Sequence, residues 1–101
     1  MGRYTLRLSK ECDIHLEHWQ KVSDKATLRK IDKIFSELIE HPKRGTGKPE
    51  ALRGGYSGYW SRRLNKKDRI IYRIDDSIVL VYVISMKGHY GDKQHPGLEP
   101  A

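Results

Sequence analysis

The sequence has one cysteine, Cys12, and no long hydrophobic run. A single cysteine cannot form an internal disulfide, so a disulfide scaffold is excluded and a reducing cytoplasm is the expected compartment. The longest apolar run, from Ile78 to Ile84, is far shorter than the roughly 20 residues of a membrane-spanning helix. Because the N-terminal residues from Tyr4 to Leu8 alternate between polar and apolar, we expect no signal peptide and no membrane contact.

Acidic residues are scarce in the middle of the chain. Residues 42–73 contain ten lysines and arginines but only two acidic residues, Glu50 and Asp68, which gives this segment a net charge of +8. The whole chain carries +7, so the remaining residues are nearly neutral together. A concentrated positive field favours a polyanion or an acidic protein as partner. Tyr59 and Trp60 lie within the segment, which makes a basic surface without a binding role the weaker explanation.

Metal ligands in a usable pattern are also lacking. Cys12, His15 and His18 lie three residues apart on one predicted helix, so their side chains point in progressively different directions. Further ligands for a four-coordinate zinc site are not found. We therefore interpret Cys12 as a small core residue and expect no metal and no cofactor.

The hydrophobic pattern predicts a single α+β domain in the order β-α-α-β-β-β, with residues 91–101 as a C-terminal tail. The predicted elements are a strand at Tyr4–Leu8, helices from Ser9 to about Val22 and from Asp24 to His41, and strands at Tyr56–Leu64, Arg69–Ile74 and Ile78–Ser85. Residues 42–55 are predicted as a loop. We expect a small antiparallel sheet with both helices packed on one face. The apolar positions of the second helix leave Glu37 on its solvent side.

Alternation assigns the strand residues to two faces of the sheet. The apolar set expected beneath the helices comprises Trp60, Leu64, Ile70, Tyr72 and Ile74. The opposite face then carries Arg63, Arg69 and Arg73 around Tyr59. Guanidinium groups bind phosphates in a fork geometry, and aromatic rings stack on bases, so this face is typical of a nucleic-acid site.

Four segments in a fixed order carry a resemblance to a known family. They are Gly47-Lys48-Pro49-Glu50-Ala51-Leu52, Ser57-Gly58-Tyr59-Trp60-Ser61-Arg62-Arg63, Asp68-Arg69-Ile70-Ile71-Tyr72 and Lys87-Gly88-His89-Tyr90. From about Tyr4 to Tyr90 the chain resembles the YoeB toxins of bacterial type II toxin–antitoxin modules, within the RelE-like superfamily. The resemblance implies the RelE-like α+β fold for residues 1–90. It also implies a ribosome-dependent endoribonuclease that cuts mRNA in the ribosomal A site.

The resemblance also implies partners and site residues. A YefM-like antitoxin would silence the toxin, and a homodimer is a further implication. The implied catalytic residues are Glu50 as general base, Arg69 as phosphate clamp, and His89 as general acid with Tyr90 beside it. The implied RNA-binding residues are Lys48, Arg53 and Arg63.

Each of these residues also has an interpretation without catalysis. Glu50 is a loop carboxylate that a salt bridge to Lys48 or Arg53 would explain. Arg69 has Asp68 and Asp76 as acidic neighbours, and a histidine after a strand is usually a surface residue. The alternative function is therefore a non-catalytic module that binds nucleic acid or an acidic peptide. Such a module would need the arginine face but neither Glu50 nor His89.

Overall fold

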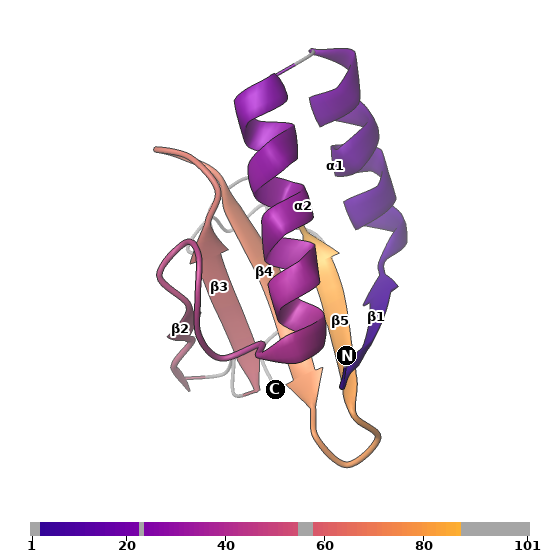
Figure 1. The fold of residues 1–101 in the computed structure, drawn as a ribbon, viewed down its shortest axis with the longest axis vertical. Coiled ribbons are helices and arrows are strands. Elements are labelled where there is room, and N and C mark those ends of the chain that lie inside the picture. The colour runs from indigo at the N-terminus through magenta and orange to yellow at the C-terminus, as the bar shows by residue number, and fades with distance from the viewer. Residues whose placement is uncertain (1–2, 23, 55–57, 88–101) are drawn as a thin grey trace.

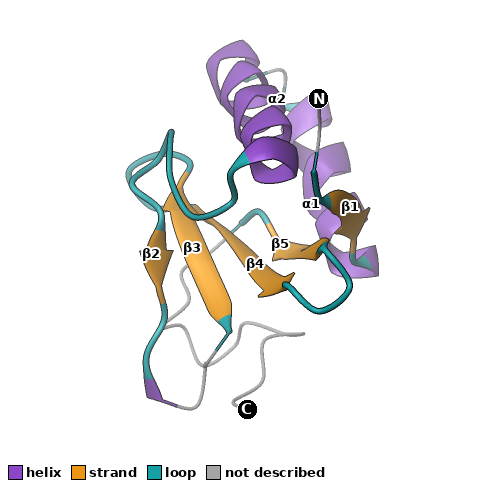
Figure 2. Cartoon of the chain, turned by 60° about the horizontal axis from the view of Figure 1, so that its bottom comes forward, coloured by secondary structure: helices purple, strands orange, loops and turns teal. Residues whose placement is uncertain are grey.

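The computed structural model describes residues 3–22, 24–54 and 58–87. These residues form the strands β1 (Thr5–Leu8), β2 (Glu50–Ala51), β3 (Tyr59–Arg63), β4 (Arg69–Asp75) and β5 (Leu80–Ser85), and the helices α1 (Lys10–Lys21) and α2 (Lys25–Glu40). The strands make one sheet in the order β1-β5-β4-β3-β2. Both helices lie side by side against the same face of that sheet (Figure 1), and the other face carries no helix of the described chain (Figure 2).

The predicted α+β class is confirmed, but the sheet is mixed rather than wholly antiparallel. Neighbouring strands from β2 to β5 pair antiparallel, whereas β1 pairs parallel with β5, with Leu6 opposite Val81. Hairpins account for the antiparallel pairs, but β1 has no hairpin link to a partner that follows more than 70 residues later. The short strand β2 is a second difference, because the sequence predicted only a loop there.

Capping side chains set the beginnings of both helices. Ser9 accepts a hydrogen bond from the backbone N–H of Cys12 at 2.9 Å, and Asp24 accepts one from that of Thr27 at 3.1 Å. Each cap satisfies a backbone donor that the first turn of a helix leaves unpaired. The second helix ends before Pro42, as predicted, because the residue before a proline disfavours helical geometry.

The main core lies between the helices and the sheet. Its buried residues are Cys12, Trp19, Ile31, Ile34, Leu38, Leu64, Ile70, Tyr72, Val81, Val83 and Met86. Trp60 and Ile74 pack against this core, so the predicted helix-side face is confirmed. The indole N–H of Trp19 donates to the carbonyl of Met86 at 3.0 Å, which joins α1 to the end of β5.

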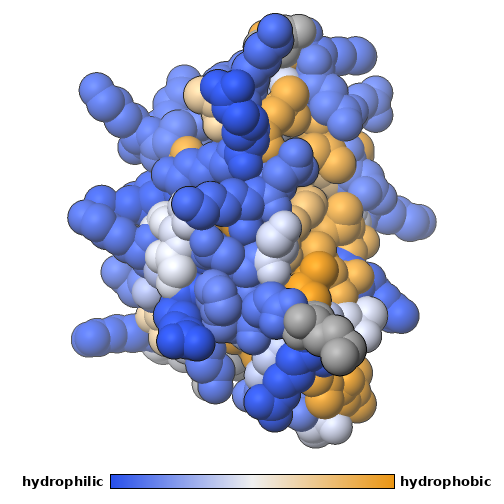
Figure 3. Space-filling view, viewed as in Figure 1, coloured by the Kyte–Doolittle hydropathy of each residue, from blue (hydrophilic) through white to orange (hydrophobic). Residues whose placement is uncertain are grey.

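The outer surface of the helix layer is mostly hydrophilic, with hydrophobic residues gathered on the side where α1 and β1 lie (Figure 3). Ile14 and Val22 are among the large hydrophobic residues that are exposed. Within the described ranges, neither helix combines the length and the apolar character needed to cross a membrane.

Candidate functional site

Strand register assembles the predicted site residues on the helix-free face. Glu50 on β2 lies opposite Ser61 on β3, and Ser61 lies opposite Ile71 on β4. One step along the same face, Arg63 lies opposite Arg69. Side chains of directly opposed residues share a face, so Glu50, Arg63 and Arg69 come together across three neighbouring strands.

The two arginines lie opposite each other, where a bound anion would relieve their repulsion. Arg63 is exposed and Arg69 is partly exposed, and like charges directly opposite each other destabilise a sheet. Within the described part of the chain, neither arginine forms an ion pair, and Glu50 forms none either. The salt-bridge explanations of Glu50 and Arg69 therefore find no support among these residues. Two neighbouring guanidinium groups instead offer several parallel donors to one phosphate.

Apolar side chains lie beside the charged ones on this face. Leu52, Ile71 and Ile84 form a second buried cluster, and Tyr59 and Tyr82 pack against it. The charged side chains of Glu50, Arg63 and Arg69 therefore border an apolar cluster. Electrostatic interactions are stronger next to such an apolar cluster than in bulk water.

The neighbour of Arg63 on β3, Arg62, is a buried structural residue. Its side chain is fully buried and pairs with Glu37 of α2 at 2.6 Å, and its Nε donates to the hydroxyl of Tyr72 at 3.1 Å. It also donates to the backbone carbonyls of His41, Arg44 and Thr46 at 2.8 to 3.2 Å. Arg62 thus clamps residues 41–46, the loop that leads from α2 to Glu50. The parity of Arg62 with Trp60 and Leu64 was the sequence signal for its burial.

The predicted solvent position of Glu37 is wrong. The side chain is only 16% exposed and accepts from Arg62 and from both the backbone N–H and the hydroxyl of Thr46, at 2.6 to 2.7 Å. Burial raises the pKa of Glu37, but the hydrogen bonds from Thr46 and Arg62 and the charge of Arg62 outweigh burial and hold the pKa below its ordinary value. Hydrophobic periodicity could not predict the burial of Glu37, because its partner, Arg62, follows 25 residues later in the chain.

Two glycines let the clamped loop approach the rest of the fold. A side chain at Gly45 would collide with the Glu37 carboxylate, and one at Gly47 would come within 2.7 Å of the Arg63 carbonyl oxygen. The carbonyl of Gly47 in turn accepts from the backbone N–H of Arg63 at 2.6 Å. The loop therefore reaches β3 beside Arg63 and turns into β2.

Lys48 has a positive φ of 51°, which is uncommon for a residue other than glycine. It is exposed immediately before Pro49 and Glu50, and Arg53 is exposed two residues after β2. Strained backbone conformations cluster near functional sites. Lys48 and Arg53, two of the three predicted RNA-binding residues, thus flank Glu50 and are accessible.

Other predicted residues lie elsewhere. His89 and Tyr90 fall outside the described residues, so their roles stay predictions. Cys12 is a buried core residue, as interpreted, and burial raises the pKa of its thiol to about 12. His15 accepts a hydrogen bond from the backbone N–H of Met86 at its Nδ1. Residues 3–22, 24–54 and 58–87 contain no group of three or more side chains arranged to hold a metal.

Known proteins are similar to this chain in sequence and in fold. The family model for the YoeB-like toxin of the bacterial type II toxin–antitoxin system matches residues 9–90. Toxin YoeB of Synechocystis is 40% identical over 72 residues, which cover 71% of this chain and 81% of that protein.

Solved structures agree with the family match. A YoeB/ParE toxin from Agrobacterium tumefaciens superposes with a TM-score of 0.77 at 34% identity, over 85% of this chain and 99% of that chain. YoeB from Staphylococcus aureus was solved as a dimer and in a heterotetrameric complex with YefM. Its TM-scores are 0.75 and 0.73, both at 30% identity over 88% of this chain and all of that chain.

The family model covers most of the chain, and structures of the same family share its fold along almost their whole length. The resemblance that the four sequence segments carried is therefore confirmed. This chain belongs to the YoeB-like toxins of bacterial type II toxin–antitoxin systems.

Proposed function

We propose that this toxin is a ribosome-dependent endoribonuclease that cuts mRNA in the A site without a metal. One observation carries the proposal: a carboxylate, Glu50, shares the helix-free face of the sheet with Arg63 and Arg69, two arginines that form no ion pair among the described residues. Metal-free RNA cleavage needs a base, cations that stabilise the charged transition state, and an acid for the leaving oxygen.

The proposed reaction assigns each residue a step. Glu50 accepts the proton of a ribose 2′-hydroxyl, and the 2′-oxygen attacks the adjacent phosphorus. Arg63 and Arg69 stabilise the negative charge that builds on the phosphate oxygens. The bond from phosphorus to the 5′-oxygen breaks, and His89 donates a proton to that oxygen. The products are a 2′,3′-cyclic phosphate and a 5′-hydroxyl.

The end of β5 is compatible with the role of His89. Ser85, the last residue of β5, lies opposite Ile71, in the same row as Ser61 and Glu50. His89 follows four residues later, and four residues of extended chain span at most about 14 Å. Strands are spaced about 4.8 Å apart, so this length reaches β4 and β3, the two strands that carry Arg69 and Arg63. Tyr90 is proposed to stack on a base beside the cut.

Lys48 and Arg53 are proposed to bind the RNA backbone on either side of Glu50. Both are exposed, and they add positive charge at the edge of the sheet. We further propose a YefM-like antitoxin as the protein partner and a homodimer as one assembly state, because a relative from Staphylococcus aureus forms both a dimer and a YefM complex.

The test is a purified bacterial translation system with a defined mRNA, in which new 5′ ends are mapped with and without ribosomes. We expect cleavage only with ribosomes, at the A-site codon, with a cyclic phosphate on one fragment and a 5′-hydroxyl on the other. Asp32→Asn, which changes an exposed carboxylate on α2, is the matched control for Glu50→Gln.

Two results would reject the proposal. Fragments with a 5′-phosphate and a 3′-hydroxyl would assign the reaction to metal-activated water. Folded protein that retains RNA without cutting it would leave the alternative, a non-catalytic nucleic-acid-binding module that uses the same arginine face.

A further inference from the structure

A second set of polar side chains crosses the helix-free face beside the proposed catalytic residues. Arg7 on β1 lies opposite Tyr82 on β5, Tyr82 lies opposite Arg73 on β4, and Arg73 lies opposite Tyr59 on β3. Arginine and tyrosine thus alternate over four neighbouring strands. We call Arg7, Tyr82, Arg73 and Tyr59 the Arg/Tyr row.

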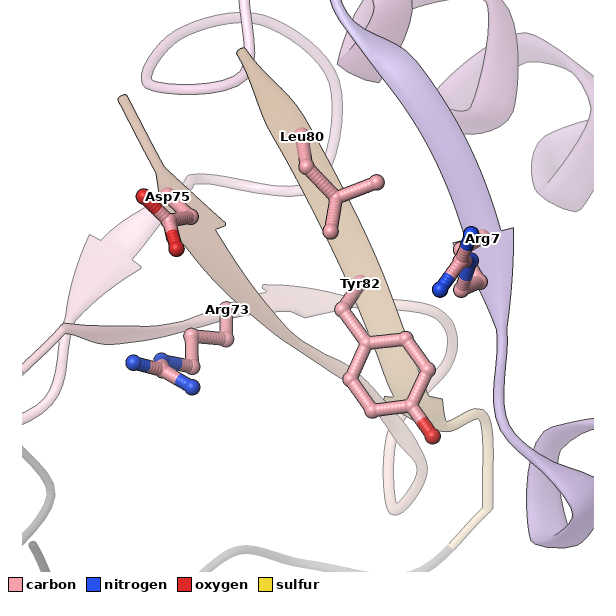
Figure 4. Close-up of a pocket in the computed structure, with 5 residues that line it drawn as sticks. All are labelled: Arg7, Arg73, Asp75, Leu80 and Tyr82. Carbon is pink, nitrogen blue, oxygen red and sulfur yellow. The ribbon is translucent and has the colours of Figure 1, made fainter. Parts of the chain in front are cut away.

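The Arg/Tyr row is accessible to solvent, and three of its residues line a depression. Arg7 and Arg73 are exposed, and both tyrosines are partly exposed. A depression of about 180 Å³ is lined by Arg7, Arg73, Asp75, Leu80 and Tyr82. Figure 4 shows the Tyr82 ring between the two arginines, with the three side chains coming from three different strands.

One carboxylate, that of Asp75, lines the depression, and it already accepts hydrogen bonds. Asp75 accepts from the backbone N–H of Ser77 at 3.1 Å and from its hydroxyl at 2.5 Å. Within the described residues, Arg7 and Arg73 form no ion pair with it. The depression therefore keeps a net positive charge from its two arginines.

The spacing of the row fits a nucleic-acid strand. Strands lie about 4.8 Å apart, so Arg7 and Arg73 are separated by about 10 Å with an aromatic ring between them. Guanidinium groups bind phosphates, and the ring offers a stacking surface to any base. An acidic peptide would use the arginines but would have no need for the rings that alternate with them.

The Arg/Tyr row also continues the proposed catalytic site. Tyr59 and Arg73 lie two residues along their strands from Ser61 and Ile71, which are in register with Glu50. Both sets project from the same face. An RNA strand held at Arg63 and Arg69 would cross the buried pair of Ser61 and Ile71 to reach Arg73, and the Arg/Tyr row continues from there to the edge strand β1.

We propose that the Arg/Tyr row is an RNA subsite that holds the nucleotides of the substrate strand next to the cut. This inference rests on the proposed function, since it assigns an additional binding surface to the same substrate. It predicts that the toxin binds a strand longer than one codon better than it binds a codon alone.

The test measures binding of the full chain to 2′-O-methylated RNA, which lacks the attacking hydroxyl and stays uncut. The probes are a trinucleotide and a dodecamer, each titrated at several salt concentrations. Tyr82→Leu is expected to weaken dodecamer binding by at least about fivefold, whereas Tyr82→Phe keeps the ring and stays within about twofold. The double variant Arg7→Gln/Arg73→Gln is expected to lower the slope of log affinity against log salt by about 0.7 for each lost contact.

Arg29→Gln, taken singly and with Lys33→Gln, is the matched control, because both residues are exposed on α2 and their loss changes the net charge equally. Thermal unfolding of each variant separates lost binding from lost structure. A double variant that binds the dodecamer with the slope of the α2 double control would overturn the inference. So would a wild type that binds the trinucleotide and the dodecamer equally well.

Two further measurements distinguish the substrate strand from an acidic peptide and from ribosomal RNA as the ligand of the row. Loss of binding to the antitoxin, with dodecamer binding intact, would assign the row to an acidic peptide instead. On ribosomes, the double variant should cut an mRNA that extends beyond the A-site codon more slowly than wild type, and cut an mRNA that ends at that codon at the wild-type rate. Equal losses on both mRNAs would assign the row to ribosomal RNA and overturn the substrate subsite.

The inference and the proposed function fail separately. Absence of ribosome-dependent cleavage by wild type rejects the function, while the salt slopes still report whether the row binds RNA. Normal cleavage by wild type together with unchanged slopes in the double variant rejects only the row.

Discussion

Arg62 and Arg63 are neighbours on β3, yet they stand in opposite environments. Arg62 is fully buried beneath the helices, where Glu37, Tyr72 and three backbone carbonyls use its donors. Arg63 is exposed on the other face, directly opposite Arg69 and without an ion pair in the described chain. Alternation along a strand sends adjacent side chains to opposite faces. One face therefore uses an arginine to hold the fold, and the other keeps arginines available for a ligand.

The division matters because a buried cluster on one face positions Glu50 on the other. We call this cluster of Arg62, Glu37 and Thr46 the clamp. Arg62 holds the loop that carries Glu50 into β2, and Glu37 fixes the same loop through Thr46. We expect variants of the clamp to lose stability first and cleavage as a consequence. Variants of the open face should lose cleavage alone.

The largest expected effect on stability comes from replacing Arg62 and Arg63, one at a time, with methionine. Arg62→Met leaves the largely buried Glu37 carboxylate without its partner, and breaking such a pair costs about 3–5 kcal/mol of unfolding free energy. Arg63→Met removes an exposed side chain and should change stability by less than about 0.5 kcal/mol. Urea unfolding of both variants measures the difference. Equal losses of unfolding free energy would contradict a structural role for Arg62 and a ligand-binding role for Arg63.

The next effect concerns chemistry on the open face. Arg69→Gln should slow cleavage by about 10²- to 10³-fold, because a donor to the charged transition state is lost. Stability should be unchanged or slightly higher, since the repulsion with Arg63 is relieved. Single-turnover cleavage on programmed ribosomes provides the rate. Arg29→Gln, with the same charge change on α2, should cut at the wild-type rate.

A smaller loss is expected at the hydroxyl of Tyr72. This group donates to the carbonyl of Pro42 at 2.7 Å and accepts from Arg62, and both contacts are buried. Tyr72→Phe leaves these partners unsatisfied and should cost about 1–3 kcal/mol of unfolding free energy. The control is Tyr4→Phe, which removes an exposed hydrogen bond to Asp76. Similar losses in both variants would contradict a special role for the clamp.

The smallest effect is a pH dependence specific to Glu37. Its pKa is held below the ordinary value of 4.5, so its contribution to stability is complete above that value and is lost as the pH falls through the folded-state pKa. Wild type should exceed Glu37→Gln in stability near neutral pH, and the gap should narrow below about pH 4.5. Chemical unfolding at several pH values measures the gap. A constant gap would show that the carboxylate charge is not what stabilises the loop.

Local signals predicted much of this fold. Ser9, Asp24 and the His41-Pro42 pair set helix limits that the structure confirms, because caps and proline act within a few residues. Alternation also assigned Arg63, Arg69 and Arg73 to the helix-free face, and the register bears this out. Local patterns have no information on partners far along the chain. The parallel pairing of β1 with β5 and the pair of Glu37 with Arg62 were missed for that reason.

The site was predictable to the same degree. Glu50 was predicted to lie in a loop, but two residues of pairing with β3 place it in register with Ser61 on the arginine face. A strand of that length leaves no periodic signal to read. The Arg/Tyr row depends on the neighbours of β5, and Arg7 joins Arg73 only through Tyr82, so the sequence pattern alone did not connect them.

Glu50→Gln and Glu37→Gln, measured together for cleavage rate on ribosomes and for urea unfolding, test the division between the two faces most directly. The account predicts that Glu50→Gln lowers the rate by about 10²- to 10⁴-fold with an unchanged unfolding midpoint, while Glu37→Gln lowers the midpoint. A Glu50→Gln variant that cuts mRNA at close to the wild-type rate would contradict the account.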